Sequence, residues 1–150
     1  MSEKIVRLME ENLQAVFNER DPQRRLTVVR RNYAPDVRWS DPDQTVTGQD
    51  RLHERAQELL DGPLSGLTFT QSGPVYQTAN LGLLAFDIFP LDRAGAGSSE
   101  PLISGYDVAI VENDVIAQLF TVTTKHPSTG LSAPSLGLET PPISAPVRTS

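Results

Sequence analysis

Hydrophobic residues near the start of the chain recur every three or four positions, the spacing of one face of an α-helix. The spacing predicts an amphipathic helix over about Glu3 to Arg20. Its apolar face consists of Ile5, Leu8, Met9, Leu13, Val16 and Phe17. A second helix is expected to begin at Asp21-Pro22, where an N-cap residue precedes a proline, and to end at Pro35. Two helices therefore open the chain.

The hydrophobic period changes to two between Asp36 and Asp41, which predicts a β-strand. Val37, Trp39 and Asp41 then share one side of that strand, and Asp41-Pro42-Asp43 is expected to form the turn that ends it. A third, short helix is expected after Gly48, with Asp61-Gly62-Pro63 as its stop.

The second half of the chain reads as a series of strands separated by turn-forming residues. The expected strands are Leu67 to Ser72, Val75 to Ala79, Leu81 to Pro90, Leu102 to Glu112 and Val115 to Thr124. The turns fall at Asn80, at the loop with Gly95, Gly97, Ser98 and Ser99, and at Asn113-Asp114. Consecutive strands joined in this way form a curved antiparallel sheet, so the element order predicts an α+β domain with helices on one sheet face.

The composition changes near Lys125 to proline, serine, threonine and glycine without hydrophobic periodicity. We therefore expect one folded domain over residues 1–124. Residues 125–150 are expected to form a flexible tail, or an arm that becomes ordered only against a partner.

The charge and composition exclude several kinds of partner. The net charge of −6 at pH 7 disfavours binding to nucleic acid. The exception is a basic cluster at Arg24, Arg25, Arg30 and Arg31, whose helical spacing predicts a solvated helix face. The sequence has no cysteine and no apolar stretch approaching the roughly 20 residues needed to span a bilayer, so we expect a cytoplasmic protein without membrane contact.

The two histidines, His53 and His126, lie far apart and without a carboxylate at metal-ligand spacing, so no metal site is expected. The sequence contains no Ser-His-Asp set, no phosphate-binding glycine loop after a strand and no dinucleotide fingerprint. No cofactor is therefore expected.

Several short motifs occur in an order that resembles a known family. They are Tyr33-Ala34-Pro35-Asp36-Val37, Trp39-Ser40-Asp41-Pro42, Gly48, Gly73-Pro74-Val75 and Gly105-Tyr106-Asp107-Val108. Each is common alone, but together they resemble the SnoaL-like and ketosteroid isomerase-like branch of the nuclear transport factor 2-like superfamily, from about Ile5 to Thr124. The resemblance implies a cone-shaped α+β barrel, in which the curved sheet wraps the long first helix and encloses an apolar pocket.

The resemblance also implies chemical roles. Ketosteroid isomerases use a carboxylate base opposed by an oxyanion hole of a tyrosine and a protonated aspartic acid. Asp41 matches the base, Asp107 matches the protonated acid, and Phe17 stands where the family has the tyrosine. Losing one oxyanion donor typically costs about a hundredfold or more in rate, which argues against steroid isomerisation by the standard mechanism.

Both aspartates also have simpler interpretations. Asp41 could cap backbone amides of its turn. Asp107 interrupts an apolar strand, so it must be neutral, solvated or paired, for example with Arg55. Substrate contacts are expected from the pocket lining, which the resemblance and the strand pattern assign to Phe17, Trp39, Phe69, Phe86 and Leu119.

Three functions remain open from the sequence. The first is an isomerase or cyclase that moves a proton on an apolar, carbonyl-bearing small molecule, with Asp41 as base. The second is a non-catalytic ligand-binding or dimerisation module, and the third is epoxide hydrolase-like water addition, in which Arg55 could take part. Both faces of the last two strands are apolar, so we also expect a homodimer through the outer sheet face.

Overall fold

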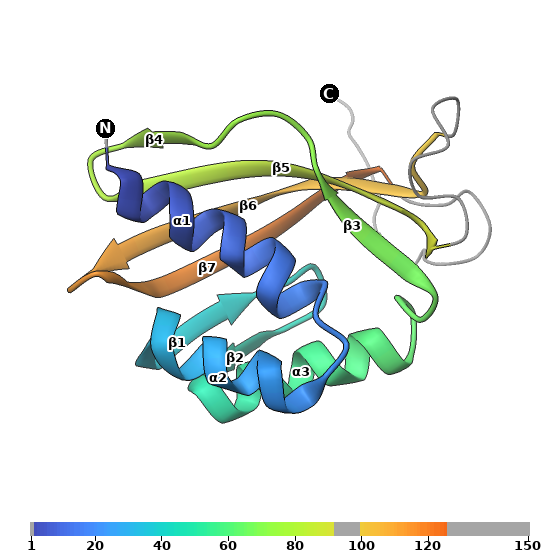
Figure 1. The fold of residues 1–150 in the computed structure, drawn as a ribbon, viewed down its shortest axis with the longest axis horizontal. Coiled ribbons are helices and arrows are strands. Elements are labelled where there is room, and N and C mark those ends of the chain that lie inside the picture. Colours follow the sequence, from blue (N-terminus) through green and yellow to red (C-terminus); the bar gives the residue numbers. More distant parts are fainter. Residues whose placement is uncertain (1, 92–99, 126–150) are drawn as a thin grey trace, which may run out of the picture.

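A computed structural model describes residues 2–91 and 100–125 of the chain. Within these residues the helices are α1 (Glu3–Glu11), which continues as the π-helical segment η1 (Asn12–Phe17), α2 (Pro22–Asn32) and α3 (Gln49–Asp61). In Figure 1, α1 lies across the middle of the curved sheet, and α2 and α3 lie together beside β1. The loop predicted around Gly95 and the predicted tail, including His126, fall outside the described residues.

The helix boundaries follow the predicted capping signals. The Asp21 side chain accepts a hydrogen bond from the backbone N–H of Arg24, and Pro22 occupies the first turn of α2. Gly48 precedes α3 with a φ of +96°, a conformation that favours glycine, and Gly62 follows its end.

Two helix boundaries differ from the predictions, and the first strand begins at Tyr33 instead of Asp36. The first helix ends at Phe17 instead of Arg20, and its last six residues are π-helical. The second helix ends at Asn32, because the residue before Pro35 favours extended backbone and β1 already begins at Tyr33.

Seven strands of the described chain form one curved, unclosed sheet. They are β1 (Tyr33–Ser40), β2 (Thr45–Thr47), β3 (Leu67–Gln71), β4 (Tyr76–Thr78), β5 (Leu81–Pro90), β6 (Ile103–Glu112) and β7 (Val115–Lys125). Their order is β2-β1-β7-β6-β5-β3, with β4 paired to β5. The predicted α+β class, with the sheet curved around the first helix, is confirmed.

The sheet is mixed, whereas a wholly antiparallel sheet was predicted. β1 pairs with β7 in parallel, with Trp39 beside Leu119 and Ser40 beside Phe120, and the other described strand pairs are antiparallel. Early and late segments of the chain therefore pair with each other inside the sheet.

Arg25 corrects the prediction of a solvated basic helix face. Its side chain is fully buried, and it donates hydrogen bonds to the backbone carbonyl of Glu19 and to Oε1 of Gln57. A buried guanidinium needs such acceptors, and here they join the connection between η1 and α2 to α3. By contrast, the neighbouring Arg24 side chain is 74% exposed, as predicted.

The core lies between the helices and the concave face of the sheet. It contains the apolar positions of α1 and η1 together with Val37, Trp39, Leu84 and Leu119. No helix among the described residues combines the length and the apolar character needed to cross a membrane.

Candidate active site

Asp107 is a buried carboxylate in the middle of the sheet. It lies on β6, between Leu84 of β5 and Thr121 of β7, and only 2% of its surface is exposed. Asn12 Nδ2 donates to its Oδ2 at 2.9 Å, and the Thr121 hydroxyl donates to its Oδ1 at 2.9 Å. Both carboxylate oxygens thus have a hydrogen-bond donor.

Two further residues extend this network. The Tyr33 hydroxyl donates to Asn12 Oδ1, and Trp39 Nε1 donates to the Thr121 hydroxyl oxygen at 3.0 Å. Tyr33–Asn12–Asp107–Thr121–Trp39 is therefore one chain of hydrogen bonds, in which each donor on either side is directed towards Asp107. We call these five residues the Asp107 network.

The surroundings of Asp107 favour proton exchange near neutral pH. Burial raises its pKa to about 7, against the smaller, opposing effect of the hydrogen bonds from Thr121 and Asn12. Burial, together with the charge of Asp107, raises the pKa of Tyr33 well above its ordinary value, so its hydroxyl remains a donor. Both protonation states of Asp107 are therefore accessible at neutral pH.

Asp41 occupies the turn after β1. Its Oδ1 accepts hydrogen bonds from the backbone amides of Asp43 and Gln44, at 2.7 and 3.0 Å. Its Oδ2 accepts from Arg55 Nε at 2.8 Å. Only 4% of the Asp41 side chain is exposed, so this carboxylate is an inward-facing turn cap that is also paired with Arg55.

The two aspartates belong to separate hydrogen-bonded groups in the described chain. Ser40, the residue before Asp41, lies beside Phe120, the residue before Thr121, in the parallel pair. Thr121 is in turn the register partner of Asp107. The backbones of the two aspartates therefore lie about two strand spacings, or roughly 10 Å, apart, with β7 between them.

The predicted lining residues form a packed interior. Phe17 contacts Trp39 and Phe69, with ring centroids 4.8 and 6.3 Å apart, and Phe69 contacts Phe86 at 5.6 Å. These four aromatic residues and Leu119 are all buried. The inward orientation expected from strand alternation is observed, and in this structure the rings pack on one another.

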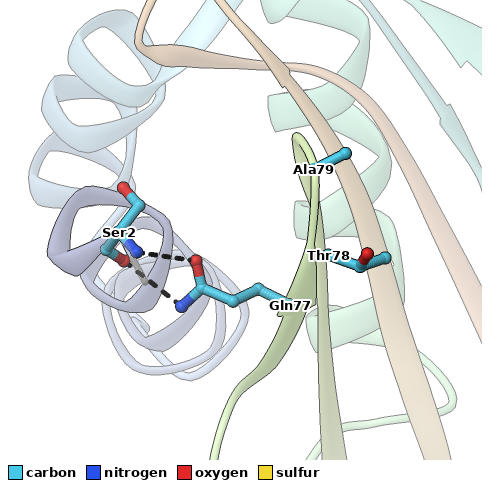
Figure 2. A pocket seen from close by; sticks show the side chains of 4 residues that line it. All are labelled: Ser2, Gln77, Thr78 and Ala79. Atoms are coloured by element: carbon cyan, nitrogen blue, oxygen red, sulfur yellow. Dashed lines mark hydrogen bonds between the residues drawn. The ribbon is translucent and has the colours of Figure 1, made fainter.

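Two surface hollows lie away from this interior. One is bordered by Ser2, Gln77, Thr78 and Ala79, and Figure 2 shows the Gln77 amide bonded to the Ser2 backbone there. The other is bordered by Pro22, His53, Glu54, Gln57, Glu58 and Asp61. None of these bordering residues belongs to the predicted site. Across residues 2–91 and 100–125, no three histidine or acidic side chains converge in a way that could hold a metal ion.

Sequence reasoning missed Asn12, Tyr33 and Thr121. Asn12 is the clearest omission, because it is a polar residue four positions after Leu8 and one before Leu13, within the apolar stripe of the first helix. It is also the first residue of η1 and is fully buried. The first helical segment thus presents Asn12, and not the residue at Phe17, to Asp107.

No protein-family model and no curated protein matches the chain. Solved structures do match it. A protein assigned to the SnoaL-like isomerases from Agrobacterium tumefaciens superposes with a TM-score of 0.72 at 18% identity, covering 82% of this chain and 99% of its own. The chain has the nuclear transport factor 2-like fold. The resemblance noted in the sequence is confirmed at the level of the fold.

Other structures with this fold differ in the names they carry. A SnoaL-like polyketide cyclase from Jannaschia sp. superposes with a TM-score of 0.64 at 13% identity, covering 82% of this chain and 89% of its own. A protein assigned as a ketosteroid isomerase from Kribbella flavida superposes with a TM-score of 0.62 at 14% identity, covering 95% of this chain and 93% of its own. An LEH-like epoxide hydrolase of M. tuberculosis superposes with a TM-score of 0.55 at 10% identity, covering 81% of this chain and 83% of its own. Because the nuclear transport factor 2-like fold carries different activities, the chemistry must be argued from the site.

Proposed function

We propose that this protein is an isomerase- or cyclase-type enzyme that moves a proton on an apolar, carbonyl-bearing small molecule, with Asp107 as the proton-exchanging group. The observation that carries this proposal is the combination of complete burial, a pKa of about 7 and two hydrogen-bond donors on one carboxylate. A general base or acid works best when its pKa lies near the working pH.

The proposal places proton transfer on Asp107 instead of Asp41, the base suggested by the sequence. Asp41 already accepts hydrogen bonds from Arg55 and from two turn amides. A role as base would require Arg55 to release that carboxylate. In the proposal, the Asp41–Arg55 pair instead fixes the turn beside Thr121, from which one arm of the Asp107 network extends.

The substrate class follows from the side chains around the network. Trp39 belongs to it directly, and Phe17, Phe69 and Phe86 continue from Trp39 as an aromatic layer. A flat, apolar substrate could replace some of these ring contacts with its own. The names of the similar structures, which include a SnoaL-like isomerase, a polyketide cyclase and a ketosteroid isomerase, support the same reaction class.

Deuterium exchange into model ketones tests the proposal in place of turnover of the natural substrate. A panel of polycyclic and monocyclic enolisable ketones is incubated with the protein in D₂O, and loss of the α-proton signal is followed by NMR. We expect exchange by the wild type and a loss of about a hundredfold or more in Asp107→Asn. Asp114→Asn, in the exposed β6–β7 turn, is the matched control and should retain full exchange. Exchange that persists in Asp107→Asn would refute the proposed role.

Water addition to an epoxide is a second candidate, favoured by one specific observation. Epoxide hydrolases of this superfamily hold the attacking water with a tyrosine and an asparagine together with two aspartates that have an arginine between them. Here Tyr33 and Asn12 are hydrogen-bonded in series to Asp107, while Arg55 pairs with Asp41. One similar structure is an epoxide hydrolase. Diol formation from an epoxide panel in ¹⁸O-labelled water, with loss in Asp107→Asn, would favour this reaction over proton transfer.

The third candidate is a non-catalytic ligand-binding module, which the tightly packed aromatic interior supports. Binding of the same ketones by the wild type and by Asp107→Asn, without exchange in either protein, would favour it.

The convex face of the sheet supports a proposal about assembly. Tyr106, Phe120 and Val122 project from it with 40%, 39% and 50% of their surfaces exposed, and Tyr106 pairs with Val122 across β6 and β7. Neighbouring exposed apolar side chains of this kind are typical of protein interfaces. We propose that a second copy of the chain covers this face, and that the protein is a homodimer.

A further inference from the structure

The side-chain amide of Asn12 lies between two groups that can each carry a proton. Its Oδ1 accepts from the Tyr33 hydroxyl, and its Nδ2 donates to Asp107 Oδ2 at 2.9 Å. Asn12 and Tyr33 are fully buried, or nearly so. The amide is therefore held at both ends, with its acceptor towards Tyr33 and its donor towards Asp107.

This orientation suits only one protonation state of Asp107. An ionised carboxylate accepts hydrogen bonds, so it requires the amide N–H that Asn12 now presents. A protonated carboxyl has an O–H that needs an acceptor. The Thr121 hydroxyl oxygen already accepts from Trp39 Nε1, and accepting a second hydrogen bond from Asp107 would turn its own proton away from the carboxyl. Asn12 Oδ1 would be a good acceptor, but it faces the other way.

An amide can exchange its donor and acceptor without moving the backbone. The oxygen and nitrogen ends have nearly the same shape, so a half-turn about the Cβ–Cγ bond reverses the direction of hydrogen bonding within almost the same volume. After that rotation, protonated Asp107 would donate to Asn12 Oδ1, and Asn12 Nδ2 would donate to the Tyr33 oxygen.

We propose that Asn12 is a positioning residue whose side-chain amide reverses when Asp107 takes up a proton, and that Tyr33 favours the orientation that stabilises ionised Asp107. In the reversed state the Tyr33 oxygen becomes an acceptor, and its own proton loses Asn12 Oδ1 as a partner. A buried donor without a partner is unfavourable, so Tyr33 opposes reversal. The inference rests on the proposed function only in taking Asp107 as the proton-exchanging group.

The backbone around Asn12 is fixed, which confines the change to the amide. Glu11 and Asn12 are consecutive in the first helical segment, and Asn32 and Tyr33 are consecutive at the junction of α2 and β1. Glu11 Oε1 accepts from Asn32 Nδ2 at 2.7 Å, beside the Asn12–Tyr33 contact. Two adjacent hydrogen bonds thus tie the same two segments together.

Few other charges act on the network. Tyr33 is the titratable group that the hydrogen bonds of the described residues bring to Asp107, and its raised pKa keeps it protonated. The nearest charged group along the helix, Glu11, is engaged by Arg7, Arg31 and Asn32. The remaining members, Asn12, Thr121 and Trp39, do not titrate.

NMR on the full-length, isotopically labelled protein tests the inference without a substrate. The Asp107 carboxyl carbon and the Asn12 side-chain amide are followed from about pH 4 to about pH 9, across the expected ionisation. In the wild type, we expect both signals to change with one midpoint near pH 7. In Tyr33→Phe, the midpoint for Asp107 should rise by about one pH unit, because the orientation that favours the ionised form loses its support.

Tyr106→Phe is the matched control, because it removes a hydroxyl from the chain neighbour of Asp107 on the opposite sheet face and should leave the midpoint unchanged. An unchanged or lowered midpoint in Tyr33→Phe would overturn the inference, since simple loosening of the site would admit water and lower the pKa. If that variant does not fold, the wild-type titration is the test. An Asn12 amide signal that does not change as Asp107 titrates rules out reversal. The titration uses no substrate, so its outcome does not depend on whether the protein catalyses the proposed reaction.

Discussion

Arg55 and Asp41 form a shielded ion pair, in which Arg55 Nε lies 2.8 Å from Asp41 Oδ2 while 11% and 4% of the two side chains are exposed. The pair joins α3 to the turn after β1. Arg55 also lies 3.5 Å from Asp43 and from Glu58. Its guanidinium is therefore close to three carboxylates, two in the turn and one on α3. The turn is thus held by a contact between elements as well as by its own backbone.

Replacing Arg55 with methionine should destabilise the protein substantially. The Asp41 carboxylate would remain shielded, with only turn amides as partners, so the free energy of unfolding should fall by about 2–3 kcal/mol. Urea unfolding measures this change. Arg51→Met is the control, because Arg51 pairs with Glu54 in solvent and such pairs contribute about 0–1 kcal/mol. Equal losses in the two variants would contradict the role assigned to the buried pair.

Asp107 should make stability depend on pH in an unusual direction. Its pKa is about 7 in the folded protein against an ordinary value of 3.8, so the folded state binds this proton more tightly than the unfolded state. Stability from this group is therefore fully present below about pH 4, falls as pH rises from about 4 to about 7, and levels off above that. The fall should reach up to about 4 kcal/mol.

Asp107→Asn isolates that contribution, because an amide of similar size does not ionise. Urea unfolding of both proteins at a series of pH values gives the difference in stability between wild type and variant. This difference should change between about pH 4 and about pH 7, because the free energy of unfolding of the wild type falls relative to that of the variant as pH rises. A difference that is independent of pH would mean that Asp107 ionises normally in the folded protein.

Phe86→Ala should open space in the aromatic layer. Phe86 is buried and packs on Phe69 with ring centroids 5.6 Å apart, so truncation should cost about 3–5 kcal/mol. The cavity should also admit small apolar molecules, and benzene or indole should raise the melting temperature of the variant but not of the wild type. A variant that is destabilised but gains no response to these ligands would indicate that the interior collapses around the gap.

Phe120→Asp should separate the proposed dimer. Phe120 is 39% exposed on the convex sheet face, and a charge at the centre of an apolar interface is strongly unfavourable. Sedimentation should show a dimer for the wild type and a monomer for the variant. Gln23→Asp on α2 adds the same charge at an exposed position in the helical layer, on the other side of the sheet, and should remain dimeric. A monomeric wild type would refute the proposal.

Much of the fold could be predicted because its signals are local. Capping residues marked the starts of α2 and α3, and alternation marked the longer strands to within a residue or two. β2 was missed, because three residues, Thr45–Thr47, are too few to show a period. The parallel pairing of β1 with β7 was also missed, because hydrophobic periodicity and turn residues indicate where strands lie but not which distant strands pair.

The candidate site was predictable only in part. Asp107 was identifiable as a charged residue among apolar strand neighbours. Its partners were not, because Asn12 lies 95 residues away in sequence, and nothing local to either residue indicates that they meet. The prediction of a solvated Arg25 was wrong for a similar reason. Helical spacing places Arg25 near other arginines, but only the packing of α3 against it shows that its side chain is buried.

The parallel contact between β1 and β7 also determines when this chain can fold. β1 lies near the beginning of the domain and β7 at its end, so β1 cannot join the rest of the sheet until almost the whole domain has left the ribosome. Until then, Val37 and Trp39 have no strand to complete their side of the core, and the edge of β1 remains open to pairing with other chains. Nascent chains that stall before Val115 are therefore the form of this protein most exposed to aggregation and most in need of a chaperone.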